Sequence, residues 1–180
     1  QNQNLILDTK FFPEAFKERL IESIDKLDEQ CDGLLLHGDN FNGLELLSKR
    51  YNEQIESIYI DPPYNTDASP IMYKNGYKDS SWLCLIASLL QKNPKFACEG
   101  ALLCLTIDDI ELDNVRLLIS ALYNNNLRGT ICIKNNPSGR STPNGLAISH
   151  EYAIISGFDD TAIIGRLPYS DKQSARYNYY

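Results

Sequence analysis

The sequence predicts an α/β fold in which helices cover both faces of a mostly parallel sheet. Short apolar segments alternate with helical segments along the chain, the pattern typical of strands connected by crossover helices. Residues 101–107 are almost continuously apolar, as expected of a strand buried on both faces. Residues 127–134 and 152–156 are joined by a loop without a helix, so we expect an antiparallel pair at the sheet edge.

Residues 1–32 are expected to form a helical segment that precedes the sheet. Within them, residues 12–30 carry apolar side chains at spacings of three and four, with charged residues between, which indicates one amphipathic helix. These side chains are Phe16, Leu20, Ile24 and Leu27.

Residues 33–158 are expected to hold the sheet and its helices. The five predicted strands are residues 34–37, 55–60, 101–107, 127–134 and 152–156. The three predicted helices each begin at a polar N-cap, which is Asp39 or Asn40, then Asp79 or Ser80, then Asp108 or Asp109. We interpret Asp108 and Asp109 as caps and expect no metal site. Residues 159–180 lack clear periodicity and are interpreted as the start of a continuation.

The composition indicates a globular protein of the reducing cytoplasm. The chain has 180 residues, of which 43% are hydrophobic and 23% charged, enough for one domain with a core. No apolar run approaches the roughly 18 residues of a membrane span, and no secretory signal is visible, so no membrane association is expected. The five cysteines are odd in number and form no Cys-x-x-Cys pair, which disfavours disulfides and structural zinc.

The formal net charge of −7 disfavours strong, generic binding to nucleic acid. The charge is uneven, however, because acidic residues crowd the N-terminal part. Residues 127–150 contain Arg128, Lys134 and Arg140 and no acidic residue. We expect this stretch to meet a nucleic acid, if one is bound.

The segment Asp61-Pro62-Pro63-Tyr64 follows a predicted strand directly, at the sheet edge where open parallel sheets bind ligands. The Asp61 carboxylate and the Pro62 carbonyl could accept hydrogen bonds from an aromatic amine, and the prolines would hold both acceptors in place. The Tyr64 ring could stack on a base that has been flipped out of a duplex. From these four residues alone, a diproline turn with a capping Asp and a packing Tyr is an equally good interpretation.

Residues 58–66, Ile-Tyr-Ile-Asp-Pro-Pro-Tyr-Asn-Thr, resemble the motif of beta-class adenine-N6 DNA methyltransferases, especially those of type III restriction-modification systems. Four further segments resemble this family in the same order: residues 36–44, 81–83, 100–109 and 149–153. The resemblance covers roughly residues 33–158. Several motifs in one order are far more specific than any single motif.

The resemblance implies a Rossmann-like methyltransferase domain, here a partial one, that transfers a methyl group from S-adenosylmethionine to adenine N6 of double-stranded DNA with a flipped adenine. A restriction subunit and a second copy of the chain are possible partners. The implied catalytic residues are Asp61, Pro62, Pro63 and Tyr64. The implied cofactor-binding residues are Asp39, Asn40, Asp61, Asn65 and Thr66. The predicted nucleic-acid contacts are Lys134, Asn135 and Asn136, which match polar residues of the family, together with Arg140 from the stretch without acids and His150. For His150 a structural role is at least as good an interpretation.

Two features depart from the family pattern. The chain has no Gly-x-Gly turn, which the family uses at its cofactor site, and Ile133 stands where many relatives have Trp. We expect the glycine turn and the target-recognition region beyond Tyr180, and therefore weak cofactor binding and no turnover by this chain alone. An RNA adenine methyltransferase and a non-catalytic methyltransferase-like module remain the alternatives.

Overall fold

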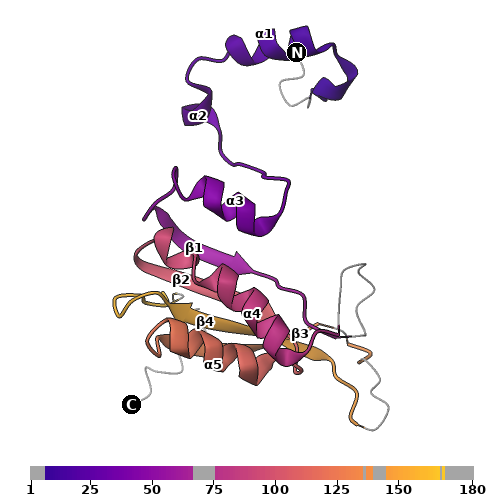
Figure 1. Cartoon of the computed structure of the whole chain (residues 1–180), viewed down its shortest axis with the longest axis vertical. Helices are drawn as coiled ribbons and strands as arrows, with labels where there is room; N and C mark the ends of the chain where they lie inside the picture. Colours follow the sequence, from indigo (N-terminus) through magenta and orange to yellow (C-terminus); the bar gives the residue numbers. More distant parts are fainter. Residues whose placement is uncertain (1–6, 67–75, 136, 140–144, 167, 169–180) are drawn as a thin grey trace. The chain divides into compact units, whose positions relative to one another are not determined.

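The structure is a computed structural model that describes residues 7–66, 76–135, 137–139, 145–166 and 168 (Figure 1). The chain divides into two compact units, Gln1–Gly38 and Asp39–Tyr180. No helix within the described ranges is long and apolar enough to cross a membrane.

The first unit contains a short 3-10 helix, η1 (Thr9–Phe11), and two helices, α1 (Glu14–Glu22) and α2 (Leu27–Gln30). The predicted single helix over residues 12–30 is wrong. The Ser23 hydroxyl donates to the Leu20 carbonyl at 2.7 Å, and Lys26 has a left-handed φ of 51°, so the chain turns between α1 and α2. No α1 residue is buried, and a short helix without packing on its apolar side is marginally stable.

Residues 34–37 also differ from the prediction, because they form no strand. The three leucines are exposed, and Leu35 keeps 95% of its surface accessible. An apolar run becomes a strand only where a neighbouring strand supplies hydrogen bonds and a core covers its side chains. Asp39 therefore does not follow a strand end.

The second unit is built on a four-stranded sheet in the order β1-β2-β4-β3. The strands are β1 (Ile55–Ile60), β2 (Ala97–Ile107), β3 (Leu127–Lys134) and β4 (His150–Gly157). These four match predicted strands, β1 and β3 with the predicted bounds. The α/β class is confirmed, and so is the antiparallel pairing of β3 with β4.

The described sheet is mixed rather than mostly parallel. Strands β1 and β2 are parallel, whereas β4 lies between β2 and β3 and is antiparallel to both. The expected fifth strand would have come from residues 34–37, which belong to the first unit and do not have strand conformation. Parallel pairing in the described sheet is therefore limited to β1 with β2, while β4 forms antiparallel pairs with β2 and β3.

Helices α4 (Asp79–Leu90) and α5 (Leu112–Leu122) cover one face of this sheet (Figure 1). The core between them and the sheet consists of large apolar side chains on alternate strand positions and on one side of each helix. Its members include Trp82, Ile86, Leu90, Leu103, Leu105, Ile107, Val115, Ile119 and Ile154. At about 25 cal/mol per Å² of apolar surface removed from water, this burial is the main force holding α4 and α5 in place.

The opposite face of the sheet carries apolar side chains that stay accessible. Tyr59 pairs with Cys104, which pairs with Ile155, so these three side chains share this face. Tyr59 is 65% exposed, and on the outer strand Ile131 is 56% exposed. In the described part of the second unit, α4 and α5 both pack on the first face, so the predicted helices are seen here on one face of the sheet.

The predicted cap at Asp39 is confirmed for α3 (Asn40–Leu47), whereas α4 and α5 begin away from their predicted caps. The N-cap of α4 is Lys78, not Asp79 or Ser80. The N-cap of α5 is Glu111, because the Asp108 carboxylate instead accepts from the Ile110 N–H at 3.0 Å and closes a turn before the helix. Short-range polar bonds of this kind compete with helix capping and move helix starts by a few residues.

Candidate active site

The Asp-Pro-Pro-Tyr segment (residues 61–64) lies at the carboxyl edge of β1, as predicted. In the parallel pair of β1 with β2, Ile60 is opposite Leu105, so the residues that follow both strands meet at this edge. Asp61 is exposed, Pro62 is buried, and Pro63 and Tyr64 are half-buried. The segment therefore presents a carboxylate and an aromatic ring from a backbone that is anchored beneath them.

Thr106, near the end of β2, orients the Asp61 carboxylate. Its hydroxyl donates to Asp61 Oδ1 at 2.8 Å and lies 3.4 Å from the Ile60 carbonyl oxygen. Thr106 is itself buried, so this donor has little freedom to move. No ion pair joins Asp61 to another of the residues that the structure describes.

Trp82 anchors the diproline turn to α4. Its indole Nε1–H donates to the Pro63 carbonyl at 2.8 Å, and the side chain is completely buried. Because proline has no N–H, the diproline turn can form few backbone hydrogen bonds of its own. The bond from the buried Trp82 indole therefore restrains the position of the Pro63 carbonyl.

Asn65 terminates the segment and has a left-handed φ of 58°. Its Nδ2 donates to the Tyr77 carbonyl at 3.0 Å and to Glu111 Oε1 at 2.7 Å, while its Oδ1 accepts from the Tyr77 N–H at 2.7 Å. The side chain is buried, and both of its amide hydrogens are used inside the protein. Asn65 thus joins the two ends of the loop between residues 65 and 77.

The Tyr64 hydroxyl lies between carboxylates. It is 3.4 Å from Glu151 Oε2, which also accepts from Asn135 Nδ2 at 2.8 Å. Partial burial raises the pKa of Tyr64 well above its ordinary value, and the charges of Asp61 and Glu151 raise it further, against a hydrogen bond with Thr106 that lowers it. The ring is therefore a neutral phenol at physiological pH, suited to stacking.

The predicted nucleic-acid contacts lie at the end of the antiparallel pair. Lys134 is opposite His150 in the β3–β4 register, and Asn135 joins the site through Glu151. The His150 Nε2 contacts the Tyr152 hydroxyl at 2.9 Å and lies 3.5 Å from Asp109. Asn136 and Arg140 are outside the described residues.

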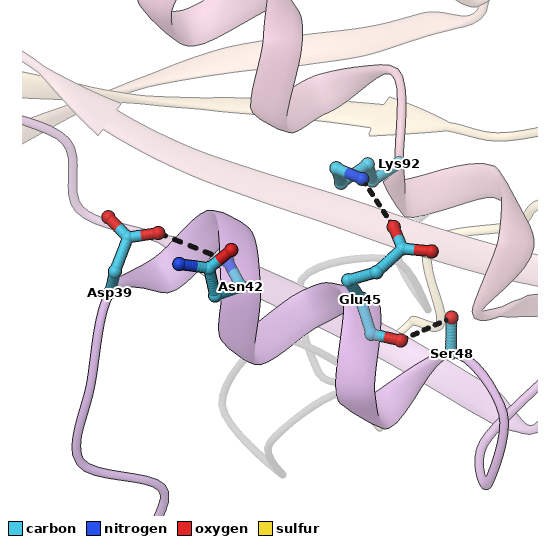
Figure 2. A network of polar contacts seen from close by, with 5 residues as sticks. All are labelled: Asp39, Asn42, Glu45, Ser48 and Lys92. Atoms are coloured by element: carbon cyan, nitrogen blue, oxygen red, sulfur yellow. Dashed lines mark hydrogen bonds and ion pairs between the residues drawn. The ribbon is translucent and has the colours of Figure 1, made fainter.

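Asp39 and Asn40 lie at the start of α3 (Asn40–Leu47). The Asp39 carboxylate accepts from the Asn42 N–H at 3.1 Å, which is an N-cap bond (Figure 2). Among the described residues, no hydrogen bond or ion pair joins either residue to Asp61. Thr66, the last predicted cofactor contact, is buried beside Asn65.

An ion pair fixes α3 to the segment after α4. Lys92 Nζ lies 2.7 Å from Glu45 Oε2 (Figure 2). The same Nζ lies 3.9 Å from the centre of the Phe41 ring. The hydrogen bond and charge of Lys92 lower the pKa of Glu45, which keeps this pair ionised.

Four residues of the site were missed by sequence reasoning: Thr106, Trp82, Glu111 and Glu151. Thr106 left one signal, because it is the only polar side chain in the apolar run of residues 101–107. Trp82 is an aromatic residue of a predicted helix, but its bond to a loop carbonyl has no sequence signature. Glu111 and Glu151 depend on contacts across the fold.

The α/β fold of this chain is shared with a solved structure. M1.HpyAVI, solved in complex with SAM, aligns with 75% of this chain and 58% of its own, at a TM-score of 0.50 and 17% sequence identity. A likeness at this identity shows the shared fold. The chain matches no family model.

The sequence relatives of this chain are a type II methyltransferase and Mod subunits of type III restriction-modification enzymes. The type II methyltransferase M.KpnI of Klebsiella pneumoniae is 27% identical over 157 residues, which are 82% of this chain and 37% of the relative. The EcoP15I Mod subunit of a type III restriction-modification enzyme of Escherichia coli is 26% identical over 153 residues, 68% of this chain and 23% of the relative. The probable HindVI Mod subunit of Haemophilus influenzae is 26% identical over 112 residues, 62% and 15% of the two lengths. The chain is a homologue of restriction-modification methyltransferases and spans about a third of their length or less.

Proposed function

We propose that this chain carries the catalytic part of a DNA methyltransferase that transfers a methyl group from S-adenosylmethionine to adenine N6 in a restriction-modification system. The observation that carries the proposal is the anchored Asp-Pro-Pro-Tyr segment. The Thr106 hydroxyl bonds to Asp61, and the Trp82 indole bonds to the Pro63 carbonyl. Glu111 bonds to Asn65, the residue that follows the segment. Such anchoring aims the acceptors before the substrate arrives, which lowers the entropy cost of reaction.

The adenine amine is a poor nucleophile because its lone pair is delocalised into the ring. A hydrogen bond from the amine to the Asp61 carboxylate, and a second to the Pro62 carbonyl, would localise that lone pair for direct in-line attack on the methyl group. The Tyr64 ring would stack on the flipped base, an interaction worth about 1–3 kcal/mol. All three groups come from one short segment, so their relative geometry is set by the backbone.

S-adenosylmethionine, when bound, supplies the methyl group from a positively charged sulfonium. The Asp61 carboxylate is exposed, and a negatively charged group at this edge fits a cationic neighbour. Asp61, Thr66, Asp39 and Asn40 are the proposed contacts to this cofactor. Asn65 was predicted with them, but its side-chain hydrogens are already used, so we assign it to the loop instead.

Double-stranded DNA with one flipped adenine is the proposed substrate. Lys134, Asn135 and His150 lie together at one end of the β3–β4 pair, and there they would contact the strand beside the flipped base. The division into residues 1–32, a catalytic part at 33–158 and a continuation from 159 toward a target-recognition region belongs to the same proposal. So do a restriction subunit and a second copy as partners.

The test is to identify the product. The full-length protein that contains this chain is incubated with S-adenosylmethionine carrying an isotopic methyl label and with unmethylated duplex DNA, and the DNA is digested to nucleosides. Labelled N6-methyladenine is the expected product. Label found in cytosine would show that cytosine and not adenine is methylated, and label found in RNA offered in parallel would show that RNA is a substrate. Absence of label from every nucleic acid would favour a non-catalytic module.

A further inference from the structure

Glu111 is an unusually buried acid that the proposed chemistry does not use. Only 1% of its surface is exposed. Its two carboxylate oxygens accept from two side-chain amides, Oε1 from Asn65 at 2.7 Å and Oε2 from Asn114 at 2.8 Å. Burying a carboxylate is costly unless it is well hydrogen-bonded. The two bonds from Asn65 and Asn114 offset this cost for Glu111.

The position of Glu111 offers an obvious structural role that its side chain does not perform. Glu111 is the N-cap residue of α5, yet its side chain makes no hydrogen bond to the free N–H groups of that helix. The carboxylate reaches toward Asn65 instead. Its contacts therefore connect the start of α5 to the loop that follows the Asp-Pro-Pro-Tyr segment.

Asn65 is the link through which Glu111 can act on the site. A left-handed backbone is unfavourable for a residue with a side chain, and Asn tolerates it best when that side chain is hydrogen-bonded. Both backbone groups of Tyr77 are bonded to the Asn65 amide, and Glu111 holds the remaining amide hydrogen. The next residue toward the N-terminus is Tyr64, whose ring direction depends on the backbone of Asn65.

We propose that Glu111 is a positioning residue for methyl transfer, which keeps Asn65 in place and thereby fixes the Tyr64 ring and the two ends of the 65–77 loop. This inference rests on the proposed function. Glu111 would touch neither base nor cofactor and would act only through Asn65. The exposed fraction of Glu111 and the bonds of Asn65 leave no room for a direct role.

The experiment compares two substitutions of Glu111 in the full-length protein. Glu111→Met keeps the length of the side chain and removes both acceptors. Glu111→Gln keeps one acceptor, which can face Asn65 while the half-exposed Asn114 turns to water. We expect Glu111→Met to lower kcat by about 10- to 100-fold with little change in the KM for S-adenosylmethionine, because a small misplacement of a reacting group costs this much. Glu111→Gln is expected to restore most of kcat.

A readout apart from catalysis is hydrogen exchange at the Tyr77 amide, which donates to Asn65. Glu111→Met should speed this exchange at least several-fold, and Glu111→Gln should not. Should Glu111→Met fail to fold, Asn65→Gly replaces it, because Gly accepts the left-handed φ but lacks the side-chain bonds. Asn65→Gly is expected to reproduce the fall in kcat and the faster Tyr77 exchange.

The results separate the two claims. Unchanged kcat and unchanged Tyr77 exchange in folded Glu111→Met would overturn the positioning role while leaving the proposed function intact. The positioning role would also be overturned if Glu111→Met and Glu111→Gln lowered kcat equally and neither substitution sped hydrogen exchange at the Tyr77 amide. Failure of the unmutated protein to methylate any adenine would overturn the proposed function itself.

Discussion

Thr106 provides the sharpest prediction, because a single hydroxyl orients the acid on which the chemistry depends. Thr106→Val removes the donor that lies 2.8 Å from Asp61 Oδ1 and nearly preserves the shape of a buried side chain. A hydrogen bond to a charged group contributes about 1.5–3 kcal/mol. Asp61 is exposed, so water replaces part of this, and we expect a loss just below that range, about 1.4 kcal/mol, or roughly tenfold in kcat.

The assay is the steady-state rate of N6-methyladenine formation by the full-length protein at saturating DNA and S-adenosylmethionine. Thr130→Val is the matched control, since Thr130 is an exposed residue of β3 in the same sheet. It should leave kcat unchanged. The reasoning is refuted if Thr106→Val retains the full rate, or if Thr130→Val loses as much.

Three further predictions concern stability, pH and stacking. Trp82→Phe removes the bond to the Pro63 carbonyl and leaves a small cavity, so the free energy of unfolding in urea should fall by about 2–4 kcal/mol; a loss below about 0.5 kcal/mol would show that the anchor is dispensable. Hydrogen bonds, the largest from Thr161, lower the pKa of Asp159, so its stabilisation is present above the ordinary carboxyl pKa and is lost as the pH falls through the lowered value. Asp159→Asn should therefore reduce stability at neutral pH, and the difference from the unmutated protein should vanish on acidification; a difference independent of pH would contradict this. Tyr64→Phe should keep kcat within about threefold, whereas Tyr64→Ala should weaken capture of the flipped base by about 10- to 100-fold, read from 2-aminopurine fluorescence at the target position; equal effects of both substitutions would exclude stacking.

The carboxyl edge of β1 could be predicted from the sequence because the information is local. An apolar segment followed by two prolines must end as a strand at that point, and β1 has the predicted bounds, residues 55–60. The same holds for β3 and for the antiparallel pair it forms with β4, since a loop without a helix cannot make a parallel crossover.

The contacts that orient the site could not be predicted, because they join residues far apart in the chain. Thr106 and Asp61 are 45 positions apart, and Asn65 and Glu111 are 46 apart. Both contacts depend on β2 lying beside β1 and on the path of the chain into α5. The sequence showed which side chains could bond, but only the sheet order shows which ones meet.

The errors at residues 12–30 and 34–37 have one common origin. Both predictions assumed that apolar side chains would be covered, and in both segments most of them remain accessible. Apolar periodicity describes what a segment can bury, whereas burial itself requires a partner surface. In the second unit, where α4 and α5 meet the sheet, that surface exists and the predicted elements form.

The proposed methyl transfer depends most directly on the Asp61 carboxylate. The decisive measurement is the rate of N6-methyladenine formation by Asp61→Ala in the full-length protein, beside Glu56→Ala, which removes an exposed acid from β1, the strand that precedes Asp61. We predict that Asp61→Ala lowers kcat by about 10²- to 10³-fold, as expected for a group that stabilises the transition state, while Glu56→Ala retains the full rate. Adenine methylation by Asp61→Ala at the rate of the unmutated protein would contradict the mechanism.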